Sequence, residues 1–457
     1  MSEEAASLPD AEYLVLSSRL VPDLDGGYTI ATLARARQLA GAGAEVSLLT
    51  FDPADAASHA AHREEFARRG SVDDPARLRN LFDEAVAAEG GAAAWLRAAA
   101  SAGSSQTVED REYRMLRDAE GRPFAALPVI PNNPDWHLTR EPVLVYDEDA
   151  RVVGGVAGFR GLYRAWLDHV TAALGDRPVV AICESRQLGE LIADWDDPRV
   201  RIIHTIHTMH LEAPYTADAP MNALWTRWFA LADRFDAVAW PTPRQRDDVE
   251  ARFGDGIRNV VVPNGIRLPD AGQRAPEPGL VVSLSRLAPG KRIDHLIRAF
   301  LAADVPGSML EIWGDGPSKA GLESLIDDLG CADRVQVRGL TTEPDAVLER
   351  ASVVVSASAY EGQGLSLAEA LGHARPVISY DVRYGPSDLL AAGGGILVPD
   401  GDETAFADAL RRVLIDAELR EQLSGEAPAA ASVWSSQRAL DALAATVRDV
   451  VAADPRR

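Results

Sequence analysis

The sequence contains only two cysteines, Cys183 and Cys331, which lie far apart and form no Cys-x-x-Cys motif. Neither a disulfide framework nor a cysteine zinc site is therefore expected, and both side chains are predicted to be small buried groups. Long apolar runs are also missing, since none approaches the roughly 18 residues that a membrane helix needs. The N-terminus is acidic where a signal peptide would be basic and then apolar, so we expect a cytoplasmic protein without a transmembrane segment.

Positive charge is scarce. The 46 Lys and Arg residues are outnumbered by 69 Asp and Glu residues, which gives a formal net charge of −23. This charge repels polyphosphate backbones at long range and disfavours general nucleic-acid binding. It still permits a local basic pocket for one phosphate-bearing small molecule. Low-complexity tracts are missing too, and 47% apolar residues indicate a folded protein with a sizeable core.

The 457 residues predict two or three domains at roughly 150 residues each. Residues 13–51 have the pattern strand, glycine turn, helix, strand, which opens a parallel sheet of the Rossmann type. A segment with three prolines and two glycines, 266–279, separates two alternating strand and helix series. The predicted fold class is α/β, with two Rossmann-like domains facing across a cleft. We place these domains at 1–265 and 279–435, with 436–457 as a C-terminal helix that packs back on the first domain.

Two segments of the first domain depart from this alternation. Residues 57–100 are rich in alanine and are predicted to be helical, with a break at Gly90-Gly91. Residues 106–160 contain short alternating segments separated by turn-prone pairs, which predict a small antiparallel β insertion. The edge strands of such an insertion could pair with a second copy of the chain, so a homo-oligomer stays open.

Ligands of open α/β sheets bind at the carboxyl ends of the strands, where glycines allow close backbone approach and helices offer free N–H groups. Gly26 and Gly27 lie at such a place, between the first strand and the first helix. They could expose N–H groups to a diphosphate, or they could form only a tight turn. The pattern is not Gly-x-Gly-x-x-Gly, so a nicotinamide cofactor is poorly supported.

The first strand of the second series is followed by Arg286 and Lys291, which flank a Pro-Gly turn. Both cationic groups could converge on one anion, although surface arginines and lysines are usually only solvated. A third strand end carries two glutamates around a glycine loop, Glu361 and Glu369. Their carboxylates could accept hydrogen bonds from sugar or ribose hydroxyls, or serve as a cap and a helix-surface charge. The backbone between them that could approach a ligand is formed by Gly362, Gln363, Gly364 and Leu365.

Three histidines occur close together at His204, His207 and His210. A zinc site is disfavoured, because positions i and i+3 of a strand face opposite sides and no further ligand with recognisable spacing follows. A substrate-binding histidine at the strand end is the better interpretation, with His204 as the first candidate and His207 as the second. The remaining histidines are then structural.

At these residues the chain resembles the retaining GT-B glycosyltransferases of glycosyltransferase family 4, and the resemblance covers nearly the whole chain. Gly314-Asp315-Gly316-Pro317 is similar to the glycine and proline turn of that family. The segment 383–387, Arg-Tyr-Gly-Pro-Ser, and the β insertion are similar to one subgroup. It contains the wall teichoic acid poly(glycerol/ribitol phosphate) α-glycosyltransferases and the adhesin Ser/Thr glycosyltransferases. Residues 57–100 match no motif of the family.

The resemblance implies a role for each motif. Arg286 and Lys291 would neutralise the diphosphate of a nucleotide sugar, and Gly26 and Gly27 would supply backbone near the phosphate or the acceptor. Glu369 would bind the ribose hydroxyls. Glu361 and the backbone from Gly362 to Leu365 would bind the donor sugar. His204, or else His207, would contact the same hexose.

The implied activity is metal-independent, retaining transfer of glucose or N-acetylglucosamine from a UDP-sugar, without a cofactor. The acceptor hydroxyl would belong to a teichoic-acid-type polymer, a glycan or a protein Ser/Thr. Arg160, Arg164 and Arg383 could line a basic acceptor groove or could be solvated surface charges. Two alternatives stay open: a sugar-nucleotide epimerase, and a non-catalytic carbohydrate-binding subunit of a glycosyltransferase complex.

Overall fold

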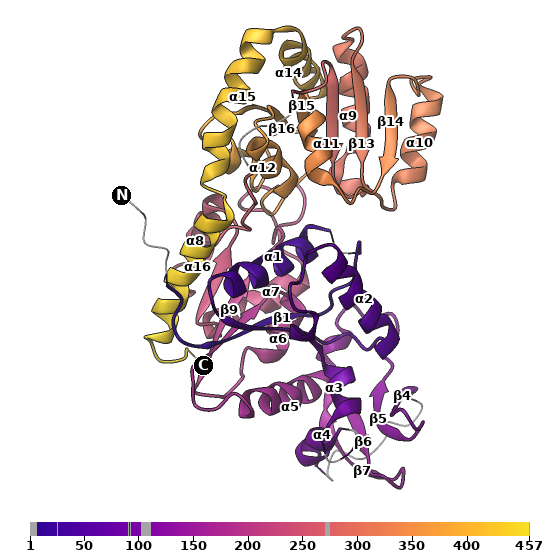
Figure 1. The fold of residues 1–457 in the computed structure, drawn as a ribbon, viewed down its shortest axis with the longest axis vertical. Helices are drawn as coiled ribbons and strands as arrows, with labels where there is room; N and C mark the ends of the chain where they lie inside the picture. Colours follow the sequence, from indigo (N-terminus) through magenta and orange to yellow (C-terminus); the bar gives the residue numbers. More distant parts are fainter. Residues whose placement is uncertain are drawn as a thin grey trace.

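The computed structural model describes residues 7–24, 26–89, 91, 93–101, 111–269 and 275–456. The predicted start of the β insertion at residue 106, part of the predicted linker and the last residue lie outside the described residues. Two lobes follow one another along the long axis of the molecule, and a small third sheet extends from the far end of the first lobe (Figure 1).

The first lobe contains a parallel sheet with the strand order β11-β10-β9-β8-β1-β2-β3. Leu14 and Leu16 of β1 pack in the core on one face of the sheet. Tyr13 and Val15 pack in the core on the other face, because successive side chains of a strand point to opposite sides. Both faces are therefore apolar and need a covering layer. The strands are β1 (Glu12–Ser17), β2 (Glu45–Thr50), β3 (Leu78–Asn80), β8 (Val179–Cys183), β9 (Val200–Thr205), β10 (Ala237–Trp240) and β11 (Asn259–Val261).

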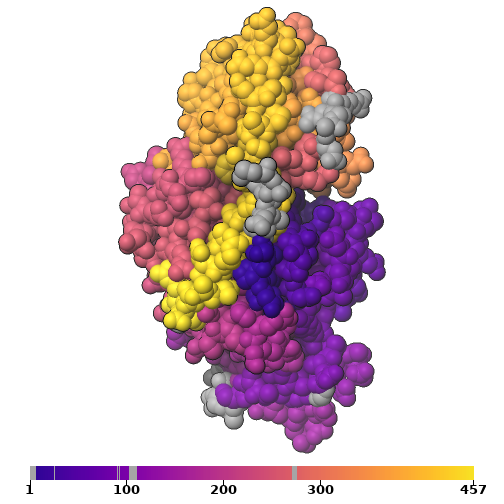
Figure 2. Space-filling model, turned by 60° about the vertical axis from the view of Figure 1, so that its left-hand side comes forward, coloured from indigo at the N-terminus to yellow at the C-terminus, as the bar shows by residue number. Residues whose placement is uncertain are grey.

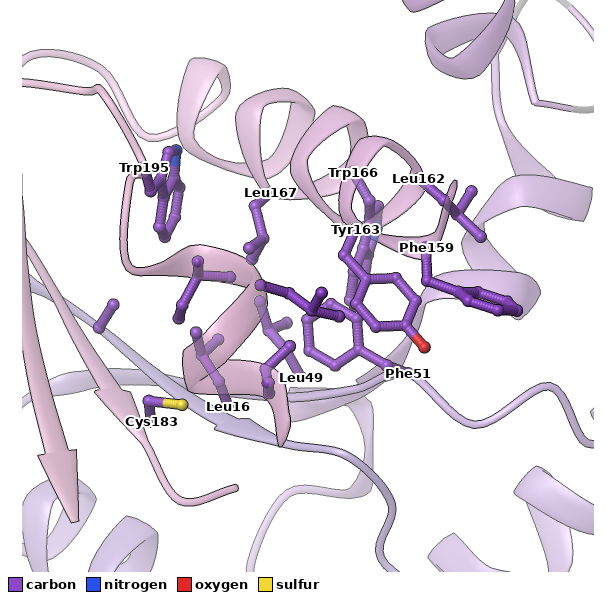
Figure 3. Close-up of a cluster of buried hydrophobic side chains, with 14 of the residues drawn as sticks. Leu16, Leu49, Phe51, Phe159, Leu162, Tyr163, Trp166, Leu167, Cys183 and Trp195 are labelled. Carbon is purple, nitrogen blue, oxygen red and sulfur yellow. The ribbon is translucent and has the colours of Figure 1, made fainter. Parts of the chain in front are cut away.

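Helix α5 (Gly158–Ala172) supplies much of the covering layer on one face. Its apolar positions recur at helical spacing, so Tyr163 and Trp166 both reach Phe51 at the end of β2, with ring centroids 4.7 and 5.1 Å away (Figure 3). The other helices of this lobe are α1 (Gly27–Gly41), α2 (Ala56–Arg68), α3 (Leu81–Ala87), α4 (Ala94–Ala99), α6 (Arg186–Ile192), α7 (Ala223–Phe229) and α8 (Pro243–Phe253).

The predicted helical character of residues 57–100 is only partly correct. Strand β3 interrupts the helices, and its three residues pair with β2. A strand this short shows too little alternation for the sequence pattern to reveal it.

The antiparallel insertion is confirmed as a sheet of order β4-β5-β6-β7. Its apolar residues Phe124, Leu127 and Val143 join the same core as α5, which anchors the insertion to the first lobe. The strands are β4 (Tyr113–Arg117), β5 (Pro123–Pro128), β6 (Pro142–Tyr146) and β7 (Val152–Ala157).

The second lobe contains a parallel sheet of order β14-β13-β12-β15-β16-β17, again with an apolar core on each face. Val281 of β12 packs on one side and Val282 on the other. Its strands are β12 (Leu280–Leu284), β13 (Met309–Trp313), β14 (Val335–Gly339), β15 (Val353–Ser356), β16 (Val377–Tyr380) and β17 (Gly395–Val398). Its helices are α9 (Ile293–Ala303), α10 (Lys319–Asp328), α11 (Pro344–Arg350), α12 (Leu365–Gly372), α13 (Pro386–Leu389), α14 (Glu403–Ile415) and α15 (Ala417–Ser432).

The chain ends with α16 (Ser436–Val451), which runs from the second lobe back along the first (Figure 2). Leu443, Val447 and Val450 enter the core that also contains β1 and α1. At the crossing point, the N–H of Ile266 donates to Trp434 O at 2.9 Å. The two polypeptide connections between the lobes therefore lie side by side.

Both cysteines are buried and free, as predicted. No helix among the described residues combines the length and the apolar character that crossing a membrane requires.

Candidate functional site

Two loops of the second lobe meet at the carboxyl edge of its sheet. One follows β12 and ends in a 3₁₀ turn, η5 (Pro289–Lys291), and the other follows β15. Because β12 and β15 are neighbouring parallel strands, the loops that follow them are adjacent. Lys291 Nζ donates to Glu361 Oε1 at 2.6 Å, and Ser358 Oγ donates to the same oxygen at 2.6 Å. The structure therefore brings Lys291 and Glu361 together.

Arg286 belongs to the same loop as Lys291, but its side chain is exposed. Within the described residues its guanidinium makes no hydrogen bond or ion pair. Its guanidinium is thus free to turn toward an anion that binds beside Lys291.

Glycine is required where the loop after β15 approaches the first lobe. A Cβ atom on Gly362 would overlap the carbonyl oxygen of His207, so only glycine permits this contact. Gly364 has a φ of +87° and caps α12 in the left-handed conformation that favours glycine. The N-terminal glycine turn lies near the same place, since a Cβ on Gly27 would be 3.6 Å from Leu365 Cδ1. Gly26, with a φ of +50°, precedes it.

Gln363 is predicted to approach the donor through its backbone, and its side chain is buried and bound elsewhere. Its Oε1 accepts from the N–H of Asn264 at 2.8 Å, and its Nε2 donates to Asn264 O at 3.0 Å. These bonds tie the loop to the connection between the lobes. Only the backbone of Gln363 is left for a ligand.

Glu369 lies half-buried on α12. Burial raises the pKa of its carboxyl to about 7, and the negative charge of Asp345 adds to the effect. Among the described residues no partner hydrogen-bonds or ion-pairs this carboxyl. A half-buried carboxyl group that has a raised pKa and no bonding partner is typical of a functional site.

His204 is not at the sheet edge, which corrects the first candidate for the hexose contact. It still belongs to β9 and is fully buried between the rings of Trp228 and Phe235, at centroid distances of 5.2 and 4.9 Å. Burial lowers its pKa to about 3, so it is a neutral core residue. The strand ends at Thr205, and only residues beyond it can reach a ligand.

His207 lies beyond the strand end and lines a cavity of about 1220 Å³. Its Nε2 lies 2.5 Å from Glu184 Oε2, and its ring meets Tyr28 edge-on at 5.1 Å. His210 packs elsewhere, against Trp225 and Phe229. The three histidines therefore face three different surroundings, and no group of three or more potential metal ligands occurs in the described part of the chain.

Glu184 organises the first-lobe side of the site, and the sequence analysis missed it. It follows β8 directly and is fully buried. Burial alone would raise the pKa of its carboxyl. The charge of Arg35, whose Nε donates to Glu184 at 2.8 Å, and the bonds from His207 and Thr205 lower it to about 2 instead. The available signal was an acidic residue directly after an apolar strand.

A chain of hydrogen bonds continues from Glu184 to the second lobe. Arg35 Nη2 donates to Asn264 Oδ1 at 3.2 Å, and the backbone of Asn264 holds the Gln363 side chain. His207, Glu184 and the glycine loop of the second lobe are therefore parts of one network. None of these partners is close in sequence, so no local motif could have revealed the network.

The arginines proposed for a basic acceptor groove are neutralised by acids. Arg160 and Arg164 both pair with Asp194 on the first lobe. Arg383 Nε donates to Asp248 on α8 at 2.6 Å, so this residue links the two lobes. The structure does not bring these three arginines together.

Comparison with known proteins shows which family the second lobe matches. Residues 267–429 match the family described as glycosyl transferases group 1. This glycosyl transferases group 1 segment contains Arg286, Lys291, Glu361 and Glu369.

Curated relatives match over part of their length. The chain is 32% identical over 200 residues to the poly(ribitol-phosphate) alpha-N-acetylglucosaminyltransferase of Staphylococcus aureus (strain COL), which covers 43% of this chain and 40% of that protein. It is 29% identical over 302 residues to the UDP-N-acetylglucosamine–peptide N-acetylglucosaminyltransferase GtfA subunit of Streptococcus parasanguinis. This match covers 61% of this chain and 58% of that protein. The chain thus matches less than two thirds of each.

Solved structures match nearly end to end. The crystal structure of TarM has a TM-score of 0.75 at 19% identity and covers 96% of this chain and 98% of TarM. The pneumococcal O-GlcNAc transferase GtfA in complex with UDP and GlcNAc has a TM-score of 0.75 at 17% identity, covering 96% and 99%. The predicted fold is confirmed: this is a GT-B fold, with two Rossmann-like domains and an antiparallel insertion.

Proposed function

We propose that this protein is a retaining glycosyltransferase that transfers glucose or N-acetylglucosamine from a UDP-sugar to an acceptor hydroxyl. The observation that carries the proposal is the Lys291–Glu361 pair at the carboxyl edge of the second sheet, packed through Gly362 against His207. The match of residues 267–429 to glycosyl transferases group 1 supports it, as do the activities that the names of the relatives state.

In this proposal the second lobe holds the donor. Lys291 and Arg286 bind the diphosphate, because two cations beside backbone N–H groups stabilise phosphate oxygens. Glu369 accepts hydrogen bonds from the ribose hydroxyls. Glu361 and the backbone of residues 362–365 bind the sugar. Gly26 and Gly27 supply backbone opposite Leu365.

His207 takes the role that the sequence assigned first to His204. Because the ionised Glu184 carboxylate accepts the Nε2–H of His207, the ring orientation is fixed. Among the described residues nothing hydrogen-bonds Nδ1. This nitrogen is therefore available to a hydroxyl of the hexose.

The proposed chemistry needs no resident metal or cofactor. The bond between the sugar C1 and the diphosphate oxygen breaks, and a bond from the acceptor oxygen to C1 forms on the same face. The acceptor proton passes to the departing phosphate oxygen, and UDP leaves. Negative charge grows on that oxygen in the transition state, so Lys291 and Arg286 act most strongly there. A chelator is expected to leave the rate unchanged.

The deciding experiment removes the Lys291 charge. Lys291→Ala is expected to slow transfer by about a hundredfold to a thousandfold while the protein stays folded, as circular dichroism would show. Arg298→Ala is the matched control, because it removes a partly exposed, ion-paired cation from α9 in the same lobe. Near-normal turnover of Lys291→Ala would refute the proposal.

Calorimetric titration with UDP-, GDP- and ADP-sugars shows which nucleotide the protein binds. A hydrolysis assay with the same donors shows which sugar it releases. Incubation with a UDP-sugar alone separates the alternatives. An epimer that forms without an acceptor would indicate a sugar-nucleotide epimerase. Binding without hydrolysis or transfer to any offered polymer, glycan or peptide hydroxyl would indicate a non-catalytic carbohydrate-binding subunit.

Association with a second copy through β4 is also part of the proposal. This strand lies at one edge of its sheet, and most of its side chains are exposed or half-buried. An unpaired strand edge can add a strand from another chain. Light scattering of the full chain, compared with an Arg114→Pro variant in β4, would show whether this edge forms the contact.

A further inference from the structure

The cavity beside His207 extends into the first lobe, away from Lys291. Its far end is formed by α6, α7 and a 3₁₀ turn, η3 (Trp136–Leu138), that belongs to the loop between β5 and β6. Its apolar walls include Trp136, Leu188, Leu191 and Trp225. Trp136 is 37% exposed, so part of this residue is accessible to a ligand in the cavity.

Arg186 is the cationic side chain at this end of the cavity. Its guanidinium lies over the ring of Trp225, 5.2 Å from the ring centroid. A guanidinium that rests on an aromatic face keeps the N–H groups at its edge free for hydrogen bonds. Gln187 lines the cavity next to it and is half-buried.

In the described part of the chain, Arg186 has no acidic side chain in direct contact. Within the described residues its side chain makes no hydrogen bond or ion pair, although it is half-buried. Burial is the main reason that its pKa is lowered. The negative charge of Glu190 opposes this shift, the charge of Arg227 adds to it, and Asp135 opposes it. A partly desolvated guanidinium without an anionic partner is unfavourable unless a ligand supplies one.

The acids nearby are already paired with other groups. Asp135 accepts a hydrogen bond from Arg227 Nη2 at 2.8 Å. Glu190 is bound by His137 Nε2 at 3.1 Å, and Arg227 lies 3.6 Å from the same carboxylate. These contacts leave Arg186 as the one charged side chain of the four that no opposite charge among the described residues touches directly.

We propose that Arg186 binds an anionic group of the acceptor, a phosphate or a carboxylate, while an adjoining part of the acceptor packs against Trp136 and Trp225. The inference rests on the proposed function, because it assigns this end of the cavity to the acceptor. Arg186 follows Glu184 by two residues, and Glu184 holds His207. Arg186 and His207 line the same cavity, so the anion and the donor sugar are bound in one continuous space. A single guanidinium selects one anionic group at this position.

Three matched small probes test the inference on the full chain: glycerol 3-phosphate, glycerate and glycerol. Ligand-observed NMR titration measures the binding of each. The wild type is expected to bind at least one of the two anions at least tenfold more tightly than glycerol, and the tighter one identifies the anionic group. Equal binding of all three probes would overturn the inference.

Arg186→Met keeps the apolar stem and removes the charge. It is expected to weaken binding of the preferred anion at least tenfold and to leave glycerol unaffected. Arg160→Met is the matched control, because Arg160 pairs with Asp194 outside the cavity lining. Undiminished anion binding by Arg186→Met would also overturn the inference. If that variant does not fold, Arg186→Gln and the wild-type comparison of charged with neutral probes keep the test decisive.

UDP titration of the same samples separates this inference from the proposed function. Normal UDP binding with anion binding that does not depend on Arg186 would reject the anion site alone. Arg186-dependent anion binding without any binding of UDP or UDP-sugars would reject the glycosyltransferase proposal alone.

Discussion

Two carboxylate–cation pairs lie where the lobes meet, one in each lobe, and they differ in their contact with water. The Arg35 and Glu184 side chains are 3% and 0% exposed. The Lys291 and Glu361 side chains are 26% and 15% exposed. The first pair also holds Thr205, His207 and Asn264, whereas the second has one further bond, from Ser358.

The difference in burial separates a positioning role from a binding role. Charges deep in the protein interact strongly but are costly to leave alone, so Arg35 and Glu184 must stay together. Water stabilises the separated ions of the half-buried pair, so Lys291 can exchange Glu361 for a phosphate group at small cost. The first lobe thus contributes a fixed His207, and the second contributes an exchangeable cation.

Removing the negative charge of the buried pair is expected to have the largest effect. Glu184→Gln keeps the shape but leaves Arg35 without a counter-charge, so the free energy of unfolding should fall by about 3–5 kcal/mol. The matched control is Glu361→Gln, for which a change below about 1 kcal/mol is expected. Urea denaturation measures both. If the free energy of unfolding falls by a similar amount in both variants, the two ion pairs do not differ in their contribution to stability.

Replacing both members of each pair sharpens the comparison. We expect the double variant Arg35→Leu/Glu184→Leu to lose less stability than the sum of the two single variants, with a coupling of about 1–3 kcal/mol. The same cycle on Lys291 and Glu361 should give less than about 1 kcal/mol. Denaturation of all six variants provides the numbers. Additive losses at Arg35 and Glu184 would contradict a tightly coupled pair.

The pH dependence of stability gives the smallest effect and has opposite signs in the two lobes. The folded-state pKa of Glu184 is lowered to about 2, so its contribution is present above the unfolded value of 4.5 and is lost as the pH falls toward 2. The folded-state pKa of Glu369 is raised to about 7. Its contribution is present below 4.5 and is lost as the pH rises through 7.

Between about pH 5 and pH 8 Glu184 stays ionised, and comparison of the wild type with Glu369→Gln separates Glu369 from the histidines whose shifted pKa values also affect stability there. The stability of the wild type relative to Glu369→Gln should fall as the pH rises over that range, while Glu184→Gln should leave the wild-type slope unchanged. If the wild type and Glu369→Gln have the same slope, Glu369 does not titrate near pH 7.

Local patterns were sufficient for the fold and for part of the site. The alternation of strands and helices predicted both parallel sheets, and the turn-rich segment predicted the antiparallel insertion. The glycines around Glu361 predict a backbone that can approach a ligand closely. The structure shows that Gly362 also approaches the carbonyl oxygen of His207. Lys291 and Glu361 follow neighbouring strands, so the rule for parallel sheets brings them together.

Sequence patterns could not show which of two nearby histidines reaches the cavity, because the two have different surroundings in the fold. His204 and His207 share the same His-Thr context, yet one is in the core and the other lines the cavity. The point at which β9 ends decides between them. Gln363 lies inside the most informative motif, but its side chain is used by Asn264.

The amino-acid sequence by itself determined the order of the elements and the glycine turns, because hydrophobic periodicity and backbone freedom act over a few residues. Only the tertiary structure decided the partners of the buried charges. Arg35 and Glu184 are separated by 149 positions, and Asn264 and Gln363 by 99. Such pairs depend on how both sheets pack, and Arg186 makes no direct ion pair with any described residue because its acidic neighbours contact Arg227 and His137 instead.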